Sequence, residues 1–304
     1  MFDEQNPEDP IQKPAILFVA DFKDVSDWFD VAYLLNSKEL DLQAVLLSAP
    51  DPDIESGLTE LFSLRKKSDS GGEKRNVSRE ILIVSGANAL QSILDEFLEP
   101  VNIISTGSGS DLLTALRTDP DLFRAKVARC FLIGGHANDY SQGRSGERIP
   151  IDPRLKEMNP ERFDSSGDIR IPAEKQEDFL RLLTSGEGVI WLPGDICLWR
   201  FSARGLLSEG GATCDFLLHR LPLASGNSEL PALLSSLPAF FLAVQPDPFA
   251  WMRLFRVVTA KVVTDAKSQK IDAIDINSEK PNLYMVIAID SAVLSKFYAA
   301  GLKG

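Results

Sequence analysis

The sequence contains few of the residues on which many catalytic and structural sites depend. Of its 304 residues only two are histidines, His136 and His219, which leaves no room for a mechanism built on a histidine network. The three cysteines, Cys130, Cys197 and Cys214, lie far apart and form no C-x-x-C pair. Neither a disulfide framework nor a thiolate zinc site is therefore predicted. We expect buried, reduced thiols in a cytoplasmic protein.

Positive charge and long apolar runs are also scarce. The chain has 32 lysines and arginines against 44 aspartates and glutamates, a net charge of -12. Such a surface repels phosphate backbones and anionic lipid, so neither a nucleic acid nor a membrane surface is an expected partner. No apolar run reaches the length of a membrane span, and the acidic opening MFDEQNPEDP does not resemble a secretion signal.

Short apolar runs alternate along the chain with amphipathic helical patterns. The runs are continuously apolar, which is typical of strands covered on both faces. The strands are expected at 15–20, 42–48, 81–85, 101–105, 129–133, 188–192 and 281–290, and the clearest helices at 27–40, 89–99, 110–127 and 291–302. Repeated strand–helix–strand units predict an α/β fold with an open, mostly parallel sheet flanked by helices.

The organisation of the chain follows from its composition. Residues 1–13, rich in charge and proline, are expected to form a flexible tail, and residues 14–304 a single α/β domain. The segments 66–80 and 137–172 read as exposed loops because they carry glycine, serine and charge. From about Ser208 to residue 280 the pattern predicts mostly helix.

Polar side chains gather where the expected strands end. In a parallel sheet, ligands bind beyond the carboxyl ends of the strands, so these residues are expected to share one pocket. They include Asp21, Lys23, Asp24, Asp27 and Asp30 after the first strand, Asp51 after the second, Thr106 after the fourth, and His136 and Asn138 after the fifth. Such oxygen-rich sites suit Ca²⁺ or Mg²⁺ more than zinc. Alternatively, Ser26 and Asp27 cap a helix beginning near Trp28.

Several segments, in the correct order, resemble the nucleoside hydrolase family of inosine- and uridine-preferring N-ribohydrolases. The segments are AILFVADFKDVSDWFDVAYLL (15–35), STGSGSDLLTALRTDPDLFRAKVARCFLIGGH (105–136), NPERFDSSGD (159–168), WLPGDI (191–196) and QPDPFAWMRLF (245–255). The resemblance covers about residues 14 to 303. It implies a nucleoside-hydrolase-like sheet and a nucleoside or riboside as the small-molecule partner. It also implies a homo-oligomer, because members of the family are often dimers or tetramers.

The resemblance also implies a set of site residues. In the family a Ca²⁺ ion holds a water and the ribose hydroxyls, and an aspartate of the opening loop takes the proton of that water. By position, the implied metal ligands are Asp21, Asp30, the Thr106 carbonyl and Asp247. Asp21 is also the candidate catalytic base if it occupies that aspartate's position. The implied substrate-binding residues are Asp51, His136, Asn138, Asp164 and Asp168.

The sequence departs from the family's pattern within this site. Lys23 replaces a second aspartate of the opening loop, Phe29 replaces one of a paired aspartate, and Pro246 replaces a histidine that can protonate a leaving group. The Lys23 ammonium could take the place of the metal. Two functions remain open. One is a divergent N-glycosyl hydrolase that uses a cation-bound water. The other is a catalytically degenerate relative that binds a nucleoside or sugar without hydrolysing it.

Overall fold

The fold is that of a computed structural model. It describes residues 13–22, 25–68, 80–86, 88–106, 109–135, 173–186, 188–199, 211–220, 233–234, 236–264, 271–276 and 281–302. The tail predicted for residues 1–13 falls almost wholly outside these ranges, as do most of 66–80 and all of 137–172. None of the described helices combines the length and apolar character that a bilayer crossing requires.

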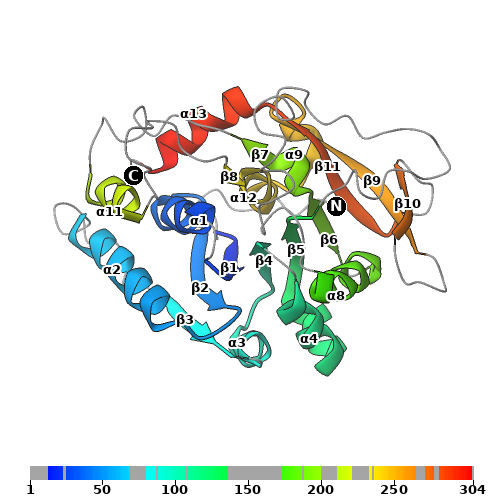
Figure 1. Cartoon of the computed structure of the whole chain (residues 1–304), viewed down its shortest axis with the longest axis horizontal. Coiled ribbons are helices and arrows are strands. Elements are labelled where there is room, and N and C mark those ends of the chain that lie inside the picture. The colour runs from blue at the N-terminus through cyan, green and yellow to red at the C-terminus, as the bar shows by residue number, and fades with distance from the viewer. Residues whose placement is uncertain are drawn as a thin grey trace, which may run out of the picture.

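A twisted sheet of nine strands forms the centre of the described structure (Figure 1). Its spatial order is β10-β9-β11-β6-β5-β4-β1-β2-β3. The strands are β1 (Ala15–Ala20), β2 (Asp41–Leu47), β3 (Leu82–Ser85), β4 (Val101–Thr106), β5 (Val127–Ile133), β6 (Val189–Leu192), β9 (Phe255–Thr264), β10 (Ile271–Ile276) and β11 (Leu283–Ile289). β9 runs opposite to the other strands, so its pairs with β10 and β11 are antiparallel, and the remaining pairs of this sheet are parallel. The predicted open, mostly parallel sheet is therefore confirmed.

Two groups of helices flank the sheet, as Figure 1 shows. In the first, α1 (Val25–Asn36) packs against α2 (Pro52–Ser68), α11 (Ala212–Arg220) and α13 (Ser291–Leu302). In the second, α4 (Ser110–Thr118) packs against α3 (Ala89–Glu96), α5 (Pro120–Lys126) and α8 (Ala173–Thr184). The remaining described elements are α9 (Gly194–Cys197), α12 (Leu237–Val244), the 3₁₀ helix η2 (Pro248–Trp251) and a small ladder of β7 (Leu198–Trp199) and β8 (Leu233–Leu234).

The central strands are buried on both faces. In β1 the residues from Ile16 to Ala20 are buried, and in β5 and β6 the largest buried side chains include Phe131 and Trp191. This explains why these strands appear in the sequence as continuous apolar runs. All seven predicted strands are present, with ends within two residues of the prediction, and the predicted terminal helix coincides with α13.

The prediction for residues 208–280 was wrong in part. Helices α11 and α12 are present, but Phe255–Thr264 and Ile271–Ile276 form the antiparallel pair β9 and β10. Their sequences, FRVVTAKVVT and IDAIDI, are rich in Val, Ile and Thr, which pack well on a pleated surface. Both runs form strands because each finds a partner in the tertiary structure: β9 pairs with β11, and β10 pairs with β9.

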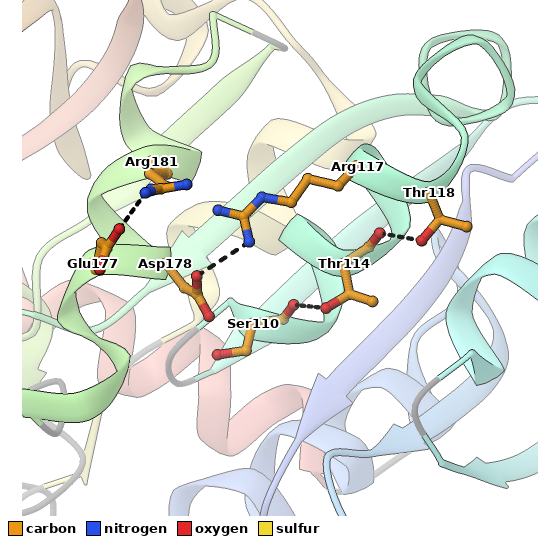
Figure 2. Close-up of polar contacts among 7 residues, drawn as sticks. All are labelled: Ser110, Thr114, Arg117, Thr118, Glu177, Asp178 and Arg181. Carbon is orange, nitrogen blue, oxygen red and sulfur yellow. Dashed lines mark hydrogen bonds and ion pairs between the residues drawn. The ribbon is translucent and has the colours of Figure 1, made fainter.

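Helix α4 is joined to α8 by a close packing contact and by surface polar groups (Figure 2). Arg117 Nη1 lies 3.6 Å from Asp178 Oδ1, and both side chains are partly exposed, so this pair contributes less than about 1 kcal/mol. The packing contact involves Gly109, whose φ is +70° and whose Cβ, if present, would lie 2.9 Å from Leu182 Cδ2. A glycine is therefore required where the chain leaves β4 and enters α4.

Helix α13 closes over α1 through a second close approach. A Cβ on Gly301 would overlap the ring of Tyr33, so the absence of a side chain allows that ring to lie against the helix. The Asn36 side-chain amide donates to the Leu302 carbonyl at 3.1 Å, which satisfies one of the last carbonyls of α13. Helix α13 is thus packed against α1 and hydrogen-bonded to it.

Candidate functional site

The candidate site lies at the carboxyl edge of the sheet, between its two central strands. β1 and β4 are neighbours, and Val19 pairs with Ser105. The residues that follow, Asp21 and Phe22 on one strand and Thr106 on the other, therefore meet at this edge. Asp21 and Thr106 are half-buried, whereas Phe22 is buried. Strand order, rather than proximity in sequence, brings these residues together.

A buried carboxylate joins the ends of the two strands. Asp27 is 3% exposed; its Oδ2 accepts the backbone N–H of Phe22 at 3.0 Å, and its Oδ1 accepts the Thr106 hydroxyl at 2.6 Å. We call Phe22, Asp27 and Thr106 the Asp27 clamp. Helix α1 begins at Val25, earlier than the start predicted near Trp28, so Asp27 lies inside its first turn. There the helix dipole favours a negative charge.

The Asp27 clamp holds an uncommon backbone conformation. Phe22 is the one described non-glycine residue with a positive φ, at 55°. This left-handed conformation is costly for a bulky side chain and is found mainly where the surrounding structure enforces it. Here the N–H bond to Asp27 enforces it, together with the Phe22 ring, whose centroid lies 4.9 Å from that of Trp28. The backbone that carries Asp21 is therefore held in one shape.

Asp30, one turn further along α1, lies in a different environment. It is fully buried, and its carboxylate accepts the Ser236 hydroxyl on one oxygen and the Tyr298 hydroxyl, at 3.0 Å, on the other. We call these three residues the Asp30 lock. Ser236 precedes α12 and Tyr298 lies on α13, so the lock connects three helical elements. These two hydroxyl donors offset part of the cost of burying the Asp30 carboxyl group.

Asp247 is the last of the predicted metal ligands. Asp247 is exposed, and its Oδ1 accepts the Phe249 N–H at 2.9 Å, which caps η2. Within the described residues, no three Asp, Glu, His or Cys side chains are placed so that they could hold a metal together. Asp21, Asp30 and Asp247, the carboxylates predicted as ligands, therefore form no such group in the described part of the chain. The calcium site stays a prediction.

The predicted substrate-binding residues are mostly outside the described part of the chain. Asp51 is described: its Oδ1 accepts the N–H groups of Asp53 and Ile54, so it caps α2. The others lie outside the described residues, as does Lys23; they are His136, Asn138, Asp164 and Asp168.

Two residues of this region, Ser236 and Tyr298, were not among the predicted site residues. They lie 206 and 268 positions from Asp30, and no local pattern signals such contacts. Asp27 was expected in the pocket, with a helix cap as the alternative, and its spacing of three residues from Asp30 places both carboxylates on one side of a helix. Knowing that β1 and β4 are adjacent would have identified Thr106 as the partner of Asp27.

Two buried phenols predict a loss of stability at alkaline pH. Burial and the Glu39 charge raise the pKa of Tyr33 to about 12. Burial, the Asp30 charge and the hydrogen bond to Asp30 raise the pKa of Tyr298 well above 10. In the unfolded chain both phenols ionise near pH 10. Their contribution to stability is therefore complete below about pH 10 and is lost as the pH rises toward the folded-state pKa values.

We expect the free energy of unfolding, obtained from urea titrations, to fall between pH 10 and pH 12. Tyr33→Phe should make this fall about 2 to 3 kcal/mol smaller, because the pKa of Tyr33 rises from 10 to about 12 on folding. Urea titrations at pH 9, 10, 11 and 12 measure the effect. Tyr284→Phe, at an exposed tyrosine, is the matched control. An equal decline in all three proteins would contradict the assignment.

The comparisons with known proteins agree with this architecture. No protein-family model matches the chain, and no curated protein matches it by sequence. Solved structures do match over nearly the whole chain. An inosine-uridine preferring nucleoside hydrolase from Bacillus anthracis has a TM-score of 0.59 at 13% identity, covering 95% of this chain and 99% of its own.

Two further structures give the same result. An inosine-guanosine nucleoside hydrolase has a TM-score of 0.60 at 12% identity, covering 95% of this chain and 99% of its own. A plant nucleoside hydrolase has a TM-score of 0.57 at 15% identity, covering 96% of this chain and 99% of its own. At such identities the likeness establishes the fold, which is nucleoside-hydrolase-like, as predicted.

Proposed function

We propose that the chain binds a nucleoside or a related riboside at the carboxyl edge of its sheet and does not hydrolyse it through a metal-bound water. The observation that carries the proposal is the Asp27 clamp, which fixes the backbone of Asp21 at the junction of the two central strands. Asp21 is half-buried there, and a carboxylate accepts hydrogen bonds from sugar hydroxyls. The matched structures are nucleoside hydrolases, which gives the ligand class.

The positions of the other carboxylates support binding over hydrolysis. Hydrolysis as the resemblance implies it needs several aspartates on one cation. Asp30 instead accepts two hydroxyls inside the helix layer, and Asp247 caps η2 at the surface. Phe29, at a position where the family has an aspartate, is fully buried and stacks on Tyr298 with 6.4 Å between ring centroids. Packing of Asp30 and Phe29 and capping by Asp247 support the binding proposal over a metal-dependent one.

Hydrolysis is the second candidate, because two of its implied elements are adjacent. Asp21 directly follows β1 and Thr106 ends the neighbouring β4, so both lie at the edge where a water-activating site would need them. A site of this kind would use Asp21 as the base. The two candidates are distinguished by free ribose, which hydrolysis releases and binding does not.

Calorimetric titration with inosine, guanosine, adenosine, uridine, cytidine and ribose tests the proposal. We expect at least one ligand to bind with a Kd in the micromolar to millimolar range, equally in EDTA and in Ca²⁺. A reducing-sugar assay on the same samples should detect no ribose above the blank. Ribose release that requires Ca²⁺ would establish the hydrolase instead, and the absence of heat with every ligand would refute the binding proposal.

Substituting Asp21 locates the ligand. Asp21→Ala should weaken binding at least tenfold because it removes the carboxylate at the edge. Asp119→Ala is the matched control: Asp119 caps α5 through the Leu122 N–H, on the path from α4 into the amino end of β5. This variant should retain wild-type affinity. If Asp21→Ala and Asp119→Ala bind with equal affinity, the ligand does not contact Asp21.

A further inference from the structure

Helix α11 comes from the last third of the chain, but it lies against the helix that begins the candidate site. It contacts both α1 and α2, and Figure 1 shows the three helices side by side. Phe216 is buried on α11, and Arg220, four positions further on, is its last residue, so both side chains lie on one side of the helix. The Phe216 ring lies 5.8 Å from that of Trp28. Helix α11 therefore meets α1 at Trp28.

The Arg220 guanidinium stacks on two aromatic rings. Its central carbon lies 3.9 Å from the centroid of the Trp28 ring and 4.6 Å from that of Phe216. Both distances allow cation–π attraction, and a planar guanidinium also stacks on a ring face, which an ammonium cannot do. Burial lowers the pKa of the half-buried Arg220, and the Glu60 charge on α2 opposes that lowering. Partial burial strengthens the attraction to the rings.

A glycine of α2 leaves room for this guanidinium. Gly57 lies inside α2, where glycine is less favourable than alanine because it loses more backbone entropy on folding. A Cβ at this position would lie 2.1 Å from Arg220 Nη2 and 2.6 Å from Arg220 Cζ. Any side chain here would therefore displace the guanidinium. Arg220 thus lies over Trp28 and directly against the backbone of α2, so it fixes Trp28 relative to both α2 and α11.

Trp28 connects Arg220 to the candidate site. Its ring is 5% exposed, and its centroid lies 4.9 Å from that of Phe22 at an interplanar angle of 64°. Phe22 has the positive φ and directly follows Asp21. Two separate contacts therefore restrain Phe22. Asp27 accepts its backbone N–H, and Trp28 packs against its ring. The second contact depends on where Arg220 holds Trp28.

We propose that Arg220 is a positioning residue of the riboside site: by holding the Trp28 ring it fixes Phe22, and with it the direction of Asp21. This role rests on the proposed function, since it assumes that Asp21 contacts a riboside. Arg220 acts through two rings, without contact with the ligand. The role also accounts for Gly57, which helix formation alone disfavours inside α2.

Calorimetric titration of Arg220→Ala with inosine, guanosine, adenosine, uridine and cytidine tests this role. Well below the unfolding transition, we expect the Kd of the riboside that binds the wild type to rise about fivefold or more, because a less ordered site binds more weakly. Arg220→Lys should raise it less, since it keeps the charge but loses the planar stacking. Arg117→Ala, at an exposed arginine that pairs with Asp178, is the matched control and should bind as the wild type does. Equal affinities of Arg220→Ala and the wild type would overturn the proposal.

Gly57→Ala tests the same contact from α2. Alanine is the better helix former, so the substitution favours α2 itself. Its Cβ nevertheless displaces the guanidinium, and we expect the Kd to rise by a factor similar to that of Arg220→Ala. When Arg220 is already alanine there is no guanidinium to displace, so adding Gly57→Ala should leave the Kd unchanged. Fold-changes that multiply in the double variant would contradict the proposal.

Amide hydrogen exchange of the free protein tests the positioning without a ligand. In Arg220→Ala the Phe22 N–H, which donates to Asp27, should exchange about tenfold faster or more. The Val19 N–H, inside β1, reports the stability of the sheet and should keep its wild-type rate. Equal acceleration of both amides, or an unchanged Phe22 rate, would overturn the proposal. If the wild type binds no riboside, the proposed function fails, and the Phe22 rate alone decides whether Arg220 holds this turn.

Discussion

Replacing Asp30 by alanine is expected to lower the free energy of unfolding by about 3 to 5 kcal/mol. The Asp30 carboxylate is fully buried and accepts hydroxyls from Ser236 and Tyr298. Its removal leaves two buried donors without their acceptor, each costing about 1 to 3 kcal/mol, and opens a small cavity between three helical elements. Urea unfolding followed by circular dichroism measures the loss. Asp119→Ala, which removes a surface helix cap, should cost only about 1 kcal/mol.

The partners of Asp30 make the prediction specific. Tyr298→Phe keeps the ring stacked on Tyr33, at 5.4 Å between centroids, and removes only the hydroxyl. It should cost about 1 to 2 kcal/mol, and the double variant should cost less than the sum of the two single ones, because the shared bond is lost only once. Additive costs, or an Asp30→Ala variant no less stable than Asp119→Ala, would show that the lock contributes no stability.

Replacing Asp27 by alanine is expected to abolish measurable riboside binding and to cost about 2 to 4 kcal/mol of stability. The Phe22 N–H and the Thr106 hydroxyl lose their common acceptor, so nothing holds Phe22 at its φ of 55°. Once the backbone relaxes, Asp21 no longer points in a single direction. The loss of affinity should therefore exceed tenfold even though Asp27 lies behind the edge that the ligand contacts. Calorimetric titration and urea unfolding of the same preparation measure both quantities.

Thr106→Val separates the role of Asp27 in the site from its role in stability. Valine keeps the shape of threonine but removes the hydroxyl that donates to Asp27 at 2.6 Å, while the Phe22 bond remains. We expect this variant to lose about 1 to 2 kcal/mol and to bind the riboside more weakly than the wild type but more tightly than Asp27→Ala. If Asp27→Ala binds as the wild type does, the Asp27 clamp has no part in recognition.

Much of the sheet was predictable because its central strands are apolar on both faces. Run 15–20 and, after Arg129, run 129–133 have no polar residue to suit an exposed face, so burial dictates their conformation. β9 and β10 were missed because their patterns mix polar and β-branched residues, and only the pairing of β9 with β11 and of β10 with β9 decides between helix and strand. The single helix predicted over 110–127 divides at Asp119, which caps a second helix that begins at Pro120.

The meeting of polar residues at the carboxyl edge of the sheet was predictable, whereas the hydrogen-bond partners of the carboxylates were not. The position of Asp21 directly after a buried strand sufficed to place it at that edge. Asp27 and Asp30 are alike in sequence, three residues apart on one helix. Their different roles come from partners far along the chain: Thr106 is 79 positions from Asp27, and Tyr298 is 268 positions from Asp30. No local pattern carries such information.

The Asp30 lock has a consequence for how the chain folds as it is synthesised. Synthesis proceeds from the N-terminus, so α1 leaves the ribosome long before the residues that complete the lock. Until Tyr298 has emerged, packing α1 would bury the Asp30 carboxylate without the hydroxyl of Tyr298 as a donor. The cost of burying it in this way is comparable to a sizeable part of the free energy of unfolding of a domain. The nascent chain is thus kept from closing its helix layer early. Chains that stop short of α13 should stay open enough for chaperones and proteases to recognise.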